Sequence, residues 1–172
     1  MTRHDEVDEI VAAWSRERPD LDLGPLDVLS RVSRLSARVD QSRSLAFTAH
    51  DLALWEFDVL AALRRSGDPY GLSPTELARI THVTSGTMTN RITRLAARGL
   101  VSRDADPSDG RAAIVSLTAA GRELVDDALA DLLTSEERLL AALPASDRTE
   151  LARLLRSLMV TLDDELSDPA QP

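Results

Sequence analysis

A run of basic residues without acids is the part of this sequence whose chemistry is easiest to interpret. Between Leu77 and Arg103 lie five arginines and none of the chain's 29 acidic residues: Arg79, Arg91, Arg94, Arg98 and Arg103. The whole 172-residue chain has a net charge of −9, so this span is a local basic island. Guanidinium groups bind phosphate and guanine well. The island indicates nucleic-acid binding, with the solvated face of an amphipathic helix as the alternative.

Small and polar residues accompany these arginines. At Ser85, Gly86 and Thr87 a backbone could come close to a duplex, so that the N–H groups of a helix start meet phosphate and side chains reach base edges in the major groove. The residues predicted to bind DNA are Ser85, Gly86, Thr87, Thr89, Asn90, Arg91, Arg94, Arg98 and, farther along the chain, Arg111.

A second set of residues could hold a small molecule. Asp58 and Arg65 are seven residues apart in a predicted helix, so they project from nearly the same face, roughly 10 Å apart along its axis. Such a pair could bracket an anionic ligand that also forms hydrogen bonds. Trp14, one of two tryptophans, and Arg91 are the other candidates. The alternatives are a core tryptophan, a surface ion pair and a phosphate-binding arginine.

Catalytic and metal-binding patterns are absent from the sequence. The three histidines are scattered without the H-E-x-x-H spacing, and there is no cysteine, nucleophile elbow or phosphate-binding glycine loop. Neighbouring carboxylates such as Asp126 and Asp127 point about 100° apart on a helix. We therefore expect no enzyme activity, no metal and no cofactor.

The arginines fall on the second of two short predicted helices. The first helix has a capping box, with Ser73 as the cap, Pro74 at the first position and Glu76 three residues on. The second helix runs from Thr84 or Ser85 to Arg98 and ends at Gly99. A two-stranded hairpin follows, up to Thr118. This order predicts a winged helix-turn-helix, in a mainly α fold with a small β-wing.

Long amphipathic helices are predicted on both sides of this unit. They span residues 5–17, 23–45 and 53–65 before it, then Thr118 to Leu143, which Pro144 ends, and a last helix capped by Ser146 and running to residue 166. Their apolar stripes exceed what a small winged helix can cover, so we expect a homodimer. The predicted parts are dimerisation and pocket-lid helices (1–50), the DNA-binding domain (51–118), C-terminal dimerisation helices (119–166) and a disordered tail (167–172). With no apolar run long enough to span a bilayer and no signal pattern at the N-terminus, we expect a cytoplasmic protein with no membrane contact.

The sequence resembles the MarR family of bacterial transcription regulators. The resemblance rests on the run T-S-G-T-M-T-N-R-I-T-R-L-A-A-R-G-L-V-S-R, followed by D-P-S-D-G-R and L-T-A-A-G. It implies a recognition helix, a wing and a long dimerisation helix, with a double-stranded, pseudo-palindromic operator as the partner. Family wings usually carry further arginines where this chain has Ser108 and Gly110, which leaves Arg111 to enter the minor groove. A winged helix that binds protein instead is the alternative function.

Three shorter motifs resemble the urate-responsive branch of that family: W-x-x-E-x-P near the start, W-E-F-D-V-L-A-A-L-R-R-S-G and M-T-N-R-I. The resemblance implies a urate site formed by Trp14, Asp58, Arg65 and Arg91, and release of DNA when urate binds. Related regulators respond to other anions, so citrate, aconitate or a phenolic compound remain alternative effectors.

Overall fold

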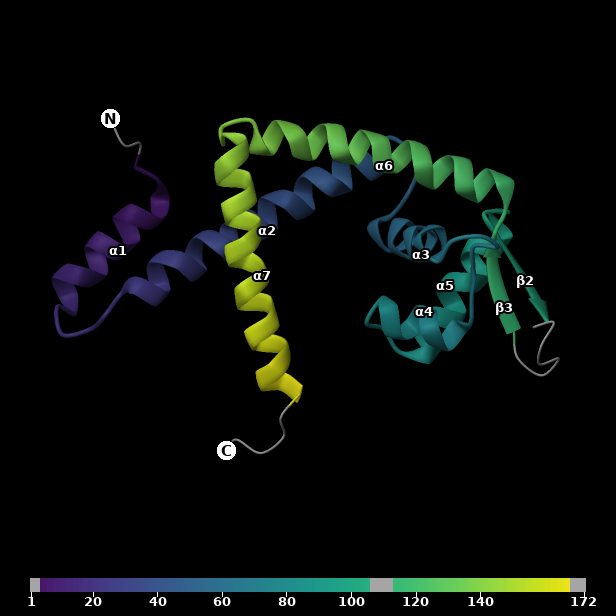
Figure 1. The fold of residues 1–172 in the computed structure, drawn as a ribbon, viewed down its shortest axis with the longest axis horizontal. Coiled ribbons are helices and arrows are strands. Elements are labelled where there is room, and N and C mark those ends of the chain that lie inside the picture. The colour runs from purple at the N-terminus through teal and green to yellow at the C-terminus, as the bar shows by residue number, and fades with distance from the viewer. Residues whose placement is uncertain (1–3, 106–112, 168–172) are drawn as a thin grey trace. The chain divides into compact units, whose positions relative to one another are not determined.

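The computed structural model describes residues 4–105 and 113–167, and Figure 1 shows the order of their elements. The helices are α1 (Glu6–Glu17), α2 (Gly24–Thr48), α3 (Leu54–Arg65), α4 (Pro74–Ile80), α5 (Ser85–Ala97), α6 (Ala119–Leu140) and α7 (Ala145–Ser167). The strands are β1 (Gly71–Leu72), β2 (Val101–Ala105) and β3 (Ala113–Leu117). The chain forms two compact units, the first ending at Leu132 and the second beginning at Leu133. The predicted fold class, mainly α with a small β-wing, is confirmed.

Local signals set the ends of α4 and α5. The Ser73 hydroxyl accepts a hydrogen bond from the Glu76 N–H (3.2 Å), and the Glu76 carboxylate accepts one from the Ser73 N–H (2.9 Å), which is the predicted capping box. The Thr84 hydroxyl caps α5 by accepting from the Thr87 N–H. After α5 the chain turns at Gly99, whose φ of 71° suits glycine.

The winged unit closes on a three-stranded antiparallel sheet of order β1-β3-β2. β2 and β3 form the predicted hairpin, with Arg103 opposite Val115. β1 was not predicted, because two residues are too few to show a strand pattern. Its position depends on Gly71, since a Cβ there would lie 2.9 Å from both Ile114 Cγ2 and Ser116 Oγ.

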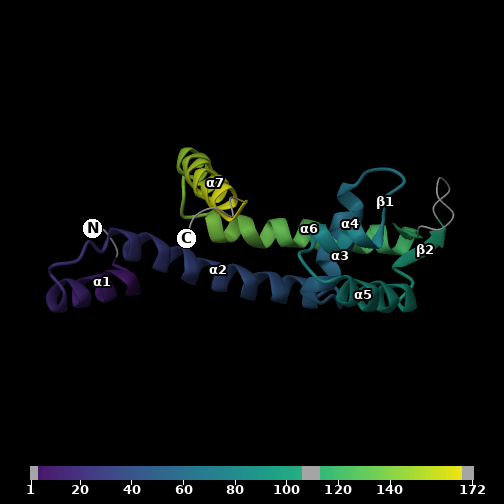
Figure 2. The same cartoon turned by 90° about the horizontal axis from the view of Figure 1, so that it is seen from below.

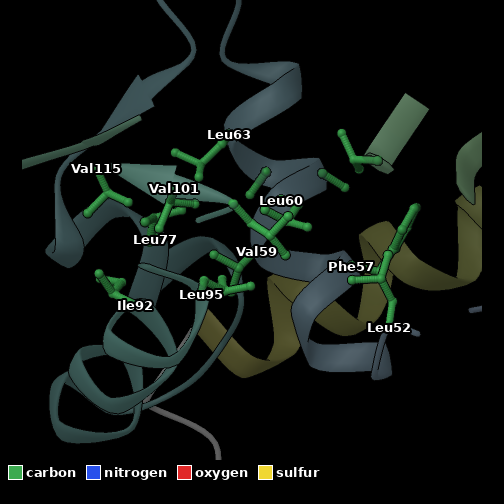
Figure 3. Packing of buried hydrophobic residues seen from close by; sticks show 14 of the residues in the cluster. Leu52, Phe57, Val59, Leu60, Leu63, Leu77, Ile92, Leu95, Val101 and Val115 are labelled. Atoms are coloured by element: carbon green, nitrogen blue, oxygen red, sulfur yellow. The ribbon is translucent and has the colours of Figure 1, made fainter. Parts of the chain in front are cut away.

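The hydrophobic core of the first unit is built around α3 (Figure 3). Val59, Leu60 and Leu63 are fully buried and pack with residues of the helix-turn-helix and the sheet, including Leu77 and Leu95. α3 thus packs directly against the core-facing side of α5.

The first turns of α6 belong to the same core. Thr118 Oγ1 accepts from the Gly121 N–H (3.0 Å) and donates to the Gly99 carbonyl (2.8 Å), so the start of α6 is tied to the end of α5. Gly121 is buried against Leu100: a Cβ on Gly121 would lie 2.0 Å from the Leu100 carbonyl oxygen. Only glycine allows this approach.

The N-terminal helix α1 lies along the first half of α2 (Figures 1 and 2). Arg31 of α2 forms ion pairs with Asp5 and Asp8 at the start of α1, each at 2.8 Å, and Arg34 pairs with Glu6 at 3.2 Å. These solvent-exposed pairs link the start of α1 to α2, and Val7 is the buried side chain of α1.

Three observed helix ends differ by a few residues from the approximate predicted ones. α2 continues to Thr48 rather than ending at residue 45, and α6 ends at Leu140 rather than Leu143. α7 begins at Ala145, so Ser146 lies inside its first turn instead of capping it; the Pro144 carbonyl accepts from the Asp147 and Arg148 N–H groups. In the described ranges, no helix has the length and apolar character to cross a membrane.

Candidate DNA-binding face and ligand cavity

Helix α5 divides cleanly into a buried and an exposed face. Met88, Ile92 and Leu95 are buried in the core. The opposite face exposes six of the predicted DNA-binding residues: Ser85, Gly86, Thr87, Thr89, Asn90 and Arg94. A Cβ at Gly86 would meet no atom within 4 Å, so glycine here is not required by packing and leaves the helix start open to a close neighbour.

Two arginines of α5 lie over one aromatic ring of α3. The Cζ atoms of Arg91 and Arg94 are 5.4 Å and 4.9 Å from the centroid of the Trp55 ring. Trp55 is partly buried and packs against the core. It was not among the predicted site residues, because nothing in the local sequence of α3 indicates which helix its ring will face.

Arg98, which was predicted to contact DNA, is an exposed residue whose guanidinium pairs with two acidic residues of the protein. Its guanidinium donates to Glu56 (2.9 Å), a buried carboxylate, and to Asp51 (3.3 Å). The Arg98–Glu56 pair joins the C-terminus of α5 to the start of α3. The pair gives Arg98 a contact within the protein, and its contact with DNA remains a prediction.

The wing is only partly described. β2 exposes Arg103, the last arginine of the basic island. Arg111, together with Ser108 and Gly110, lies outside the described residues, so the predicted minor-groove contact remains a prediction.

A cavity of about 240 Å³ lies beside α3 and the turn of the helix-turn-helix. Its lining includes Asp58, Arg65, Ile80, Thr81 and His82. The expectation that Asp58 and Arg65 share one face of a helix is confirmed. The volume is somewhat below the roughly 300–1,000 Å³ of drug-sized sites.

The other two predicted ligand residues do not line this cavity. Trp14 lies on α1 and is 50% exposed. Arg91 lies close enough to act on the charge of Asp58. Thr81 and His82 do line the cavity but were not predicted. No local sequence signal marks them, because the cavity forms only where the turn between α4 and α5 packs beside α3; in that turn His82 adopts a left-handed backbone (φ 52°).

Asp58 is the electrostatic link between the cavity and α5. Although solvent reaches this side chain, the surrounding protein atoms desolvate the carboxyl group and raise its pKa above the ordinary value. Three cations oppose this effect by stabilising the carboxylate: first Arg91, then Arg43 and Arg65. The charge of Arg91 therefore stabilises the charged form of Asp58, across the boundary between the cavity and α5.

Neither a catalytic constellation nor a metal centre is found in the part of the chain that the structure describes. It contains no group of three His, Asp or Glu side chains placed to hold a metal ion. The arrangement suits binding: an exposed polar and basic helix face, and beside it a small cavity with one acid and one arginine.

Comparison with known proteins agrees with this arrangement. The model of the MarR family matches residues 50–112. The HTH-type transcriptional regulator PecS of Dickeya dadantii is 34% identical over 155 residues, which cover 90% of this chain and 93% of PecS.

Solved structures show the same fold. Bordetella bronchiseptica BpsR, solved to explain how 6-hydroxynicotinic acid regulates its DNA binding, matches with a TM-score of 0.65 and 27% identity over 77% of this chain and 92% of BpsR. A mutant of Escherichia coli MarR complexed with operator DNA matches with a TM-score of 0.65 and 23% identity over 90% of this chain and 99% of that chain. With PecS similar along nine-tenths of its length, this chain belongs to the MarR family of transcriptional regulators, which bind operator DNA.

Proposed function

We propose that this protein is a repressor that binds a pseudo-palindromic operator as a homodimer and releases it when a small anion enters the cavity beside α3. The observation that carries the proposal is the exposed face of α5, where small polar residues and arginines gather on an otherwise acidic chain. Such a face attracts phosphate where the rest of the surface repels it.

Homodimerisation is supported by apolar side chains that a single subunit leaves in water. Large exposed hydrophobic residues recur along α2, α6 and α7: Val28, Leu29, Val32 and Leu35; Leu129, Leu133, Leu139 and Leu140; and Leu154, Leu158, Met159, Val160 and Leu162. Exposed apolar surface on this scale marks an interface. A two-fold axis would then set two α5 helices in successive major grooves, roughly 34–36 Å apart.

Within each DNA-binding face, two residues would play separate parts. Arg94 is a long, exposed cation, suited to phosphate, and Asn90 is an exposed amide, suited to an adenine edge. Arg94→Ala should weaken binding to operator and random duplex alike, whereas Asn90→Ala should mainly relax sequence preference. Equal losses on both duplexes in both variants would contradict this division of roles.

The ligand would act through Asp58. An anion that pairs with Arg65 brings negative charge toward the Asp58 carboxylate, whose pKa desolvation already raises. Because Arg91 is the foremost cation acting on Asp58, the disturbance reaches α5 and lowers its affinity for DNA. Thermodynamic linkage requires the anion to bind the free protein more tightly than the DNA-bound protein.

We propose urate as the effector. It is a compact, planar anion of two fused rings, which suits a cavity of about 240 Å³. Its N–H groups could donate to Asp58 while its charged edge pairs with Arg65. Trp14 does not line the cavity within one subunit, but half of its surface is exposed, so in the proposed dimer its indole could stack on the ligand from α1 of the other subunit. Citrate has the charge but not the planar rings, so it is the natural competitor to compare.

The test is fluorescence anisotropy of a labelled duplex from the gene's own upstream region, titrated with protein and then with urate or citrate. A random duplex at the same salt concentration is the control. We expect specific binding that urate reverses. Specific binding reversed by citrate alone would overturn urate as the effector, and equal binding to both duplexes would overturn the operator proposal.

Two variants test the ligand site apart from DNA binding. Arg65→Ala and Trp14→Phe should keep operator affinity but require more urate for release. Arg64→Ala is the matched control, because Arg64 is the adjacent arginine on α3 and pairs with Asp126 of α6 (2.8 Å). Loss of operator binding in both test variants would mean that Trp14 and Arg65 serve the fold rather than the ligand.

A further inference from the structure

Trp55 of α3, the helix that contributes Asp58 and Arg65 to the cavity, contacts two arginines of α5. It lies in the first turn of α3, and its ring faces α5, where the Cζ atoms of Arg91 and Arg94 lie within 5.4 Å of its centroid. The two arginines are one turn apart on α5, so their charges repel each other. The negative face of one indole ring attracts both.

This contact leaves the arginines able to bind DNA. A cation over a ring uses the central part of the guanidinium, while its N–H groups lie at the rim and remain available as donors. Arg94 is an exposed residue while its Cζ lies 4.9 Å from the centroid of the Trp55 ring. The ring therefore limits where the two guanidinium groups can go without occupying the groups that phosphate needs.

We propose that Trp55 is a positioning residue for DNA binding: its ring holds Arg91 and Arg94 in place before the duplex arrives. Free arginine side chains lose considerable rotamer entropy when they are fixed on a duplex. Side chains already restrained on an indole lose less of it at that moment. The inference rests on the proposed DNA-binding role of α5 and adds a residue that need not touch DNA itself.

Trp55 also lies close to Asp58, which lines the cavity. Trp55 and Asp58 are three residues apart on α3 and so share a face of that helix. Arg91 interacts with both of them, with the ring as a cation over its face and with the carboxylate through its charge. A change in the charge of Asp58 would alter how strongly Arg91 is attracted to the Trp55 ring. Because Arg94 lies over the same ring, its position would be affected as well.

The chain provides a matched control in Tyr70. Arg64 and Arg122 lie 5.0 Å and 5.3 Å from the centroid of its ring, so Tyr70 also carries two arginines. That cluster joins α3 to α6 and includes none of the exposed residues of α5. Removing the Tyr70 ring tests the general effect of losing an aromatic that binds two arginines.

The experiment measures operator affinity of the full-length dimer by anisotropy, for Trp55→Leu, Trp55→Phe and Tyr70→Leu. Fixing one rotamer-rich side chain on binding costs about a factor of two to ten in affinity, and the ring restrains two such side chains beforehand. We expect Trp55→Leu to weaken operator binding about five- to thirty-fold, Trp55→Phe to weaken it less because a phenyl ring still attracts cations, and Tyr70→Leu to leave it nearly unchanged. Thermal unfolding establishes that each variant is folded.

A double-mutant cycle separates positioning from a purely structural role. If Trp55 acts through Arg94, then Arg94→Ala should cost much less affinity in the Trp55→Leu background than in the wild type. Independent losses that simply multiply would overturn the proposal, as would unchanged or tighter operator binding by Trp55→Leu. If Trp55→Leu does not fold, Trp55→Phe decides the question, and unchanged affinity there overturns it.

Fluorescence gives an independent measurement, because the chain has only two tryptophans. In a Trp14→Phe background the remaining emission comes from Trp55, and operator DNA should change it, because the charges over the ring become paired with phosphate. Emission that stays constant through saturation with DNA would count against the proposal. Absence of specific DNA binding by the wild type would instead refute the proposed function, which keeps the two failures distinct.

Discussion

The removal of Arg98 distinguishes a DNA contact from a structural pair. Arg98 is the third arginine in the sequence of α5 and its cap, and by sequence it belongs with Arg91 and Arg94. The structure instead pairs it with Glu56 at 2.9 Å, across 42 positions of the chain. We expect Arg98→Ala to destabilise the fold and to change little in the DNA affinity of the molecules that remain folded.

The magnitude follows from the burial of Glu56. Its side chain is only 7% exposed, and one oxygen, Oε2, accepts from both Arg98 and the Ala53 N–H. Breaking a well-buried ion pair costs about 3–5 kcal/mol, and losing a charged hydrogen bond about 1.5–3 kcal/mol. Arg98 is 33% exposed, so solvent screens the pair and the lower range applies, about 2 kcal/mol. In a chain of this size that corresponds to a fall in Tm of about 4–8 °C.

The assay is thermal unfolding at fixed protomer concentration, paired with operator binding across a salt series. Glu56→Gln serves as the partner variant, and the double variant should be little less stable than Arg98→Ala alone. If Arg98 contacted a DNA phosphate, Arg98→Ala would instead reduce the slope of log affinity against log salt concentration by about one. An unchanged Tm together with that fall in slope would refute the structural assignment of Arg98.

Three further changes test other parts of the structure. Gly121→Ala places a Cβ 2.0 Å from the Leu100 carbonyl oxygen, so the urea midpoint should fall by the equivalent of about 1–3 kcal/mol or more; an unchanged midpoint would contradict the close approach of α6. Thr84→Ala removes the cap of α5 and should cost about 1 kcal/mol in the same measurement, with weaker operator binding; equal stability would mean that the cap contributes nothing. Desolvation raises the folded-state pKa of Asp58, so the charged carboxylate lowers the stability of the fold at pH values above that pKa. Asp58→Asn should therefore stabilise the protein near pH 7, and this gain in stability should vanish as the pH falls below the ordinary carboxyl range. A gain that persists in acid would argue against desolvation as the cause.

Local chemistry made the helix-turn-helix predictable. The cap at Ser73, the cap at Thr84 and the left-handed turn at Gly99 each depend on a few neighbouring residues, and the structure contains all three. The shared face of Asp58 and Arg65 was equally accessible, because helical periodicity alone fixes it.

The remaining features depend on partners that are distant in sequence. Glu56 lies among apolar residues of α3, and nothing near it indicates that Arg98 will neutralise it. The role of Trp55 and the entry of His82 into the cavity likewise require knowing how α3 packs against α4 and α5. The stacking partner of Trp14 depends on what α1 contacts besides α2. The sequence of one chain does not define those contacts.

The arginines over Trp55 also determine which signals could switch the DNA-binding face. This chain contains no lysine, so every cation on α5 is a guanidinium, which keeps its charge at any pH that a cell experiences and offers no amine for acetylation. Neither deprotonation nor lysine acetylation can therefore remove positive charge from α5. Control through the position of its arginines remains open to this helix, and a ring and a carboxylate on the neighbouring helix can exert it.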